Sequence, residues 1–107
     1  MGETKPLIPT VDAIVVALCA DYERRKAAIK SHDCSFGAEM EYKYVNYKML
    51  AAAQEIAGIA EAEIYIKEIG ARTGYTNSLI TDYSETTYKN RKKEVKSAIA
   101  RKLRLVD

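Results

Sequence analysis

Apolar residues recur every three or four positions along most of this chain, which is the period of an amphipathic α-helix. The pattern predicts helices over 10–30, 36–57 and 60–71, and a last, long helix from Ser84 to about residue 104. The composition is rich in Ala, Lys, Glu and Ile and has 2 prolines, which also favours helix. The predicted fold class is therefore all-α, a helical bundle that ends in a long basic helix.

The first helix has the clearest pattern. Residues 1–9 are predicted to be a flexible lead-in, because Pro6 and Pro9 prevent helix formation, and Thr10 is expected to cap the helix. Residues 31–35 should form the following turn. The apolar face consists of Val11, Ile14, Val15, Leu18, Cys19, Tyr22 and Ile29.

The second helix has apolar residues on more than one face. One stripe is formed by Tyr42, Val45, Met49, Ala52, Ile56 and Ile59, and a second set by Met40, Tyr44, Tyr47 and Leu50. We expect this helix to be covered on two sides, by the first helix and by either the C-terminal half or a second subunit. Residues 10–58 would then be a helical hairpin ending near Gly58, with a possible homodimer through helix 36–57. Its tyrosines could stack on bases, but core and rim positions are favoured.

At 107 residues the chain is long enough for one domain, which we place at 10–107. Its net charge of +2 hides an asymmetry, since residues 84–107 hold 8 of the 17 Lys and Arg but 3 of the 15 Asp and Glu. A mildly acidic body with a basic terminal helix suits a polyanionic partner. A charge run is also the ordinary solvated face of a helix, so a helical protein–protein module that does not bind DNA is the alternative.

Several other classes are not favoured. Two cysteines are too few for a disulfide framework, and His32-Asp33-Cys34 lacks the second ligand pair that zinc needs. No catalytic triad or phosphate-binding glycine loop is present. We therefore expect no enzyme activity, metal or cofactor. No apolar run has the length of a membrane span and the first residues lack a signal peptide, so the expected location is cytoplasmic, with no membrane contact.

The second half, 60–107, fits a helix-turn-helix in two registers, because short helices joined by tight turns are what this motif needs. In the first, Glu63–Thr73 is the bracing helix, Gly74 the turn, and Thr76–Asp82 the recognition helix. Its candidate DNA contacts are Arg72, Thr76, Asn77 and Ser78. In the second, Thr76–Asp82 braces and the helix from Ser84 reads DNA.

We favour the second register because its reading helix is richer in positive charge. The candidate contacts are Glu85, Thr86, Thr87, Lys89, Asn90, Lys92, Lys93 and Lys96. Asn90 suits a bidentate contact to adenine, Glu85 can accept from a cytosine amino group, and lysines suit phosphate or guanine. Tyr88, Val95, Ile99, Leu103 and Val106 would form the buried stripe of the same helix.

The segment Tyr83-Ser-Glu-Thr-Thr-Tyr-Lys-Asn-Arg-Lys-Lys-Glu-Val resembles small phage and prophage regulators of the ArpU/RinA type in its order of Ser, Thr, Tyr and paired Lys. Those regulators are similar to the DNA-reading region four of bacterial sigma factors. The resemblance spans roughly 62–105 and is specific mainly over 83–104. It implies that Ser84 is the helix cap, Tyr88 the buried anchor, and Glu85, Thr86, Lys89, Asn90 and Lys93 the groove-facing residues. The implied function is sequence-specific regulation of transcription on double-stranded DNA, and contact with RNA polymerase is left open.

Overall fold

The computed structural model describes residues 6–106, and the regular structure in this part of the chain is all helical. The helices are α1 (Pro9–Ala20), α2 (Tyr22–Ser31), α3 (Phe36–Ala57), α4 (Ile59–Ala71), the 3₁₀ turn η1 (Tyr75–Asn77) and α5 (Glu85–Lys102). The predicted all-α class is confirmed. Among the same residues no helix is both long and apolar enough to cross a membrane.

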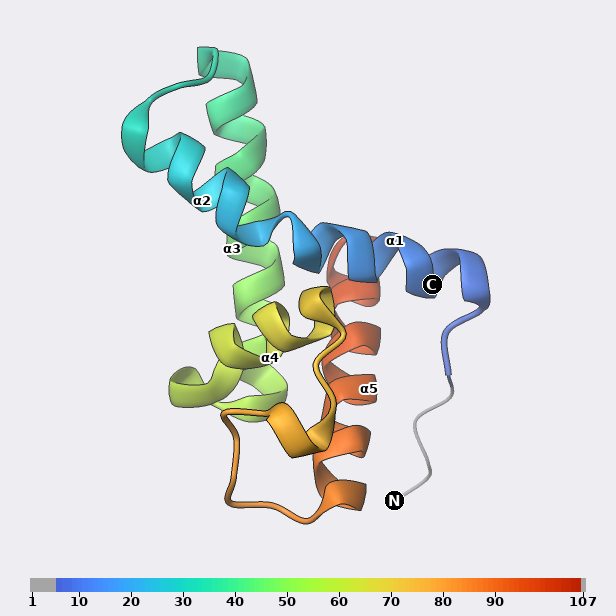
Figure 1. The fold of residues 1–107 in the computed structure, drawn as a ribbon. Coiled ribbons are helices and arrows are strands. Elements are labelled where there is room, and N and C mark those ends of the chain that lie inside the picture. The colour runs from blue at the N-terminus through green and yellow to red at the C-terminus, as the bar shows by residue number, and fades with distance from the viewer. Residues whose placement is uncertain (1–5, 107) are drawn as a thin grey trace.

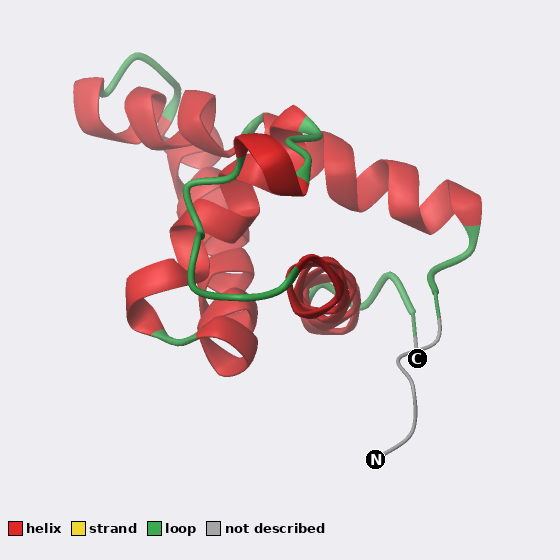
Figure 2. Cartoon of the chain, turned by 60° about the horizontal axis from the view of Figure 1, so that its bottom comes forward, coloured by secondary structure: helices red, strands yellow, loops and turns green. Residues whose placement is uncertain are grey.

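The long helix α3 is the axis around which the other helices are placed (Figure 1). Its C-terminal half packs against α4 and α5, and its N-terminal half packs against α2. Helix α1 crosses α4 and α5 at the middle of the molecule. As a result, α2 and the first half of α3 form an arm that projects from a body made of α1, α4, α5 and the rest of α3. The view along α5 in Figure 2 shows the loop before α5 passing over the outside of this body.

The single helix predicted over 10–30 is wrong, because the chain bends at Asp21 and forms two helices. Arg25, which is 4% exposed, stabilises the bend. Its guanidinium donates to the carbonyl oxygen of Leu18 at 2.7 Å and to the Asp21 carboxylate at 3.1 Å. The Leu18 carbonyl therefore accepts from a side chain, whereas in a continuous helix it would accept from a backbone N–H.

The start of α1 also differs from the prediction. The helix begins at Pro9, its N-cap is Ile8, and no side chain caps it. Proline is favourable at the first helical position, where no partner is needed for the missing N–H. Pro9 therefore starts the helix instead of preventing it, and Thr10 lies inside it. Of the predicted lead-in, residues 1–5 lie outside the described part.

The predicted helix 36–57 and the turn before it are confirmed. The Ser35 hydroxyl accepts from the N–H of Ala38 at 3.2 Å and caps α3. Gly58 has φ +81°, in the region that favours glycine, and it ends the helix as expected. Inside the arm, Asn46 is 8% exposed and accepts from Arg25 at 2.7 Å, which joins α3 to α2.

The core lies between α1, the inner half of α3, α4 and α5. Its largest fully buried side chains are Tyr65, Tyr88, Met49, Ile66, Ile99, Val15 and Val95. The predicted stripe of α5 is therefore correct at Tyr88, Val95 and Ile99, whereas Leu103 and Val106 are half-buried. Other predicted apolar positions face solvent: Ile14 is 41% and Ile59 84% exposed.

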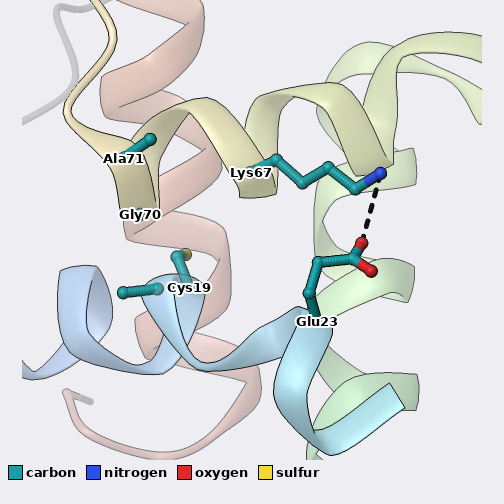
Figure 3. Close-up of a pocket in the computed structure, with 6 residues that line it drawn as sticks. Cys19, Glu23, Lys67, Gly70 and Ala71 are labelled. Carbon is teal, nitrogen blue, oxygen red and sulfur yellow. Dashed lines mark ion pairs between the residues drawn. The ribbon is translucent and has the colours of Figure 1, made fainter. Parts of the chain in front are cut away.

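Helices α1 and α4 cross at close range at Gly70 (Figure 3). A Cβ atom at Gly70 would lie 2.5 Å from the backbone N of Ala20, so only glycine fits. Beside the crossing is a shallow hollow bridged by the Lys67–Glu23 ion pair at 3.2 Å. Cys19 lies at its base, and burial raises the pKa of this thiol to about 12. The thiol therefore stays protonated at neutral pH, as an ordinary core residue does.

We expect Gly70→Ala to lower the free energy of unfolding by about 1–3 kcal/mol or more. The added Cβ would meet backbone atoms of α1, and these can move aside only if the whole helix moves. Chemical denaturation followed by circular dichroism measures the change. Gly37→Ala is the matched control, since a Cβ there would meet no atom within 4 Å. It should leave stability unchanged or raise it by up to about 1 kcal/mol. Equal effects of the two substitutions would contradict the assignment of a tight crossing.

Candidate nucleic-acid interface

Helix α4 ends at Ala71 and Arg72 is its C-cap, so the turn after the helix begins at Arg72 and not at the predicted Gly74. Arg72 has φ +55°, in the left-handed region. Its N–H donates to the Ile69 carbonyl at 3.2 Å, and the Thr73 N–H donates to the Glu68 carbonyl at 2.9 Å. These two bonds satisfy two of the four free carbonyls at the end of α4. Gly74 is extended, with φ −85°.

The predicted helix Thr76–Asp82 is absent. One 3₁₀ turn, Tyr75–Asn77, is followed by extended and bent backbone up to Ser84. The physical reason is the Glu68 carboxylate, which accepts from the Leu79 N–H at 2.8 Å and from the Ser78 hydroxyl at 2.6 Å. The Leu79 N–H therefore bonds a side chain of α4 and not a carbonyl four residues earlier. Both predicted registers placed a helix here, so neither is present in the form expected.

Glu68 also fixes the start of α5. Its carboxylate lies 2.7 Å from the hydroxyl of Tyr88, and the two side chains are 5% and 1% exposed. Burial, together with the bond to Glu68, raises the pKa of Tyr88 to about 12. Tyr88 is therefore a hydrogen-bond donor at neutral pH. Its ring packs between those of Tyr65 and Tyr75, with centroids 5.9 and 5.8 Å away.

The predicted cap and anchor of α5 are both confirmed. The Ser84 hydroxyl accepts from the N–H of Thr87 at 3.2 Å, and Glu85 lies in the first turn, where the helix dipole favours a negative charge. Tyr88 is the buried anchor. The first turns of α5 are thus held from inside, while their outer face stays free of other elements.

The outer face of these turns carries most of the predicted DNA contacts. Exposed residues there are Glu85, Thr86, Lys89, Asn90 and Lys93. Thr86, Lys89, Asn90 and Lys93 have the spacing i, i+3, i+4, i+7, which places them on one side of the helix. Lys89 is 62% exposed and only 3.8 Å from Glu85, a pair that solvent largely screens. Thr87 is half-buried.

Two predicted contacts, Lys92 and Lys96, are half-exposed and also form bonds within the molecule. The Lys92 ammonium donates to the Thr73 carbonyl at 2.7 Å and lies 5.2 Å from the Tyr88 ring centroid. Burial lowers the pKa of Lys92. Lys96 pairs with Asp12 of α1 at 2.7 Å, with side chains 24% and 33% exposed. Both lysines therefore tie α5 to its neighbours.

Lys92 and Lys96 also line a hollow beside the exposed face. Its other lining residues are Val16, Ile69, Arg72, Thr73 and Gly74. Arg72, a candidate of the alternative register, is thus brought next to the candidates of the favoured one. Between residues 6 and 106, the three cations have one carboxylate partner in an ion pair, Asp12, and they form a surface suited to an anionic group such as a phosphate.

The rest of the alternative register is not assembled for reading DNA. Thr76 and Asn77 are exposed on the 3₁₀ turn, which continues into extended and bent backbone over 78–84 and not into the recognition helix that this register needs. The Ser78 hydroxyl donates to Glu68 and accepts from the Ile80 N–H at 2.9 Å. Ser78 is therefore part of the loop framework.

Four buried polar residues were missed by the sequence analysis: Arg25, Asn46, Glu68 and Ser97. Glu68 had a signal, because it lies three residues after Tyr65 and so on the same side of α4, where a buried charge needs partners. Within residues 6–106, no three His, Cys, Asp or Glu side chains come together as metal ligands.

Comparison of the chain with protein-family models, with curated proteins and with solved structures found no match. The resemblance over 83–104 therefore remains an expectation.

Two tyrosines of α4 and α5 provide a matched test of the Glu68 contact. Tyr88→Phe removes a bond to a buried carboxylate, so we expect unfolding free energy to fall by about 1.5–3 kcal/mol. The Tyr65 hydroxyl is buried without a partner among the described residues. Tyr65→Phe should therefore leave stability unchanged or raise it. Urea denaturation of both variants gives the comparison, and a larger loss for Tyr65→Phe would contradict it.

Proposed function

We propose that this protein is a sequence-specific DNA-binding regulator of transcription that reads the major groove with the first turns of α5. The observation that carries the proposal is the exposed row Thr86, Lys89, Asn90 and Lys93 on a helix start held from inside by Tyr88. An α-helix fits the major groove, and recognition helices contact bases through their N-terminal residues.

The residue types on this row have complementary roles. Asn90 presents an amide, which pairs bidentately with the N6 and N7 edge of adenine. Lys89 and Lys93 supply charge for phosphate or guanine, and Thr86 offers a hydroxyl and a methyl group. Glu85, at the first position of the helix, can accept from cytosine while it also interacts with Lys89.

The backbone of the DNA would be held beside this row. Arg72, Lys92 and Lys96 line the adjacent hollow, which continues the positive surface from α5 toward the end of α4. Phosphate contacts fix the register of a protein on the duplex without reading sequence. In this proposal the base contacts come from Glu85, Thr86 and Asn90, and the phosphate contacts come from Lys89 and Lys93 and from the cations of the hollow.

A helix-turn-helix of the sigma region-four kind would consist of α4 as the bracing helix and α5 as the reader. The loop over residues 72–84 takes the place of the short helix, with Glu68 holding it in position. From the resemblance over 83–104 we infer a phage- or prophage-type regulator. RNA polymerase is the further partner that the resemblance raises.

A second candidate is a protein-interaction module without DNA binding. It is favoured by one observation, the exposed apolar residues of α3: Phe36, Met40, Tyr44 and Tyr47 are 78%, 55%, 58% and 70% exposed. In the first proposal the same residues would serve a homodimer, since one reading helix covers few base pairs and two raise affinity.

The test begins with unbiased selection of double-stranded DNA sites by the purified protein, followed by titrations at several salt concentrations. Lys89→Ala and Lys93→Ala should each weaken binding to all sequences. Each should reduce the slope of log affinity against log salt by about 0.9. Lys30→Ala is the matched control, because Lys30 is exposed on α2, on the arm, and it should change neither quantity.

Asn90→Ala tests base reading separately. We expect discrimination at one base pair to fall by about 1–3 kcal/mol, while the salt slope stays the same. A selected motif identical to that of the unmodified protein would show that α5 does not read sequence in this way. Absence of any DNA binding at low salt would favour the protein-interaction module.

A further inference from the structure

The arm of the molecule carries an apolar face that the fold leaves uncovered. Phe36, Met40, Tyr44 and Tyr47 follow the spacing i, i+4, i+8, i+11, which aligns them along one side of α3. All four are more than half exposed. The other sides of α3 pack against α2, α4 and α5, and the arm projects from the body, so a partner can approach it (Figure 1).

We propose that this face binds the same face of a second copy, with the two α3 helices antiparallel and the two-fold axis passing near Tyr44 and Val45. The inference extends the homodimer named in the proposed function. It does not depend on DNA binding.

Charge complementarity points to a second copy. Glu41 and Lys48 are seven residues apart, so they lie on the same flank of the apolar row. Neither forms an ion pair with any residue between 6 and 106, whereas Glu39 and Lys43 pair with each other at 3.3 Å. In an antiparallel pair about a two-fold axis, Glu41 of each copy meets Lys48 of the other. Two ion pairs therefore form at once.

The same register brings apolar residues together. When Glu41 is opposite Lys48 of the second copy, Met40 lies between Tyr47 and Ala51 of that copy. Tyr44 lies near Tyr44 and Tyr47 of the second copy, close to the axis. In a parallel arrangement the flanks that carry Glu41 and Lys48 in the two copies would lie on opposite sides of the interface, so both ion pairs would be lost.

The size of the face sets the expected strength. Large side chains of this kind bury about 150–250 Å² each, so the four exposed residues offer roughly 500 Å² per copy at the exposures given above. A standard interface buries about 800 Å² per partner. The methylene stems of Lys43 and Lys48 can supply part of the difference. We therefore expect a weak, reversible dimer with a dissociation constant on the order of micromolar.

Sedimentation of the full chain over a concentration series tests the proposal without DNA. Glu41→Lys and Lys48→Glu should each weaken the dimer about tenfold, since two attractive pairs become repulsive. The double variant Glu41→Lys/Lys48→Glu should restore the original affinity. Lys30→Glu is the control for the change in net charge and should have no effect. Circular dichroism confirms that each variant is folded.

Tyr44→Ser should abolish the dimer at every concentration at which the unmodified chain dimerises. A chain that stays monomeric at hundreds of micromolar would overturn the proposal. A dimer that the two single charge reversals leave unchanged, or that the double variant does not restore, would overturn the antiparallel register. Because no DNA is present, failure here leaves DNA binding by α5 standing, and failed DNA binding leaves the dimer standing.

Discussion

The buried carboxylate of Glu68 is the point at which three parts of the chain are joined. It accepts from the Ser78 hydroxyl and the Leu79 N–H of the loop, and from the hydroxyl of Tyr88 on α5. A carboxylate removed from water is costly unless its oxygens are paired. These three donors supply the pairing and, in doing so, set both the path of the loop and the position of α5 against α4.

A second buried polar group has a similar role in the arm. The guanidinium of Arg25 bonds the Leu18 carbonyl at the bend between α1 and α2, and also bonds Asn46 on α3. The two networks divide the molecule. One holds the arm with the proposed dimer face, and the other holds the body with the proposed DNA face. The side chains of each face are exposed and take no part in the adjacent hydrogen-bond network.

The hydrophobic period was sufficient to predict the all-α class, the long helix 36–57 and the buried anchor Tyr88, because these depend on one-face burial and local capping. The hydrophobic period failed to predict structure where a side chain from another part of the fold bonds a backbone group that a helix would pair locally. The helix over 76–82 is lost to a carboxylate about ten residues earlier, and the bend at Asp21 depends on Arg25 and Asn46. Of the candidate site, Thr86, Lys89, Asn90 and Lys93 are exposed as expected. The internal bonds of Lys92 and Lys96 depend on Thr73 and Asp12, which the pattern of α5 alone could not reveal.

The ion pair between Lys96 and Asp12 joins residues 84 positions apart, and α1 packs on both α4 and α5. Helix α1 is therefore covered by elements that are made after it, first α4 and then α5. On the ribosome, α1 would dock on α4 first, and the side of α1 that faces α5 would stay open until α5 has emerged. Because contacts of long sequence separation cost the most loop-closure entropy, a chain truncated before α5 would keep the crossing of α1 and α4 at Gly70 but would lose the support that α5 gives to both helices.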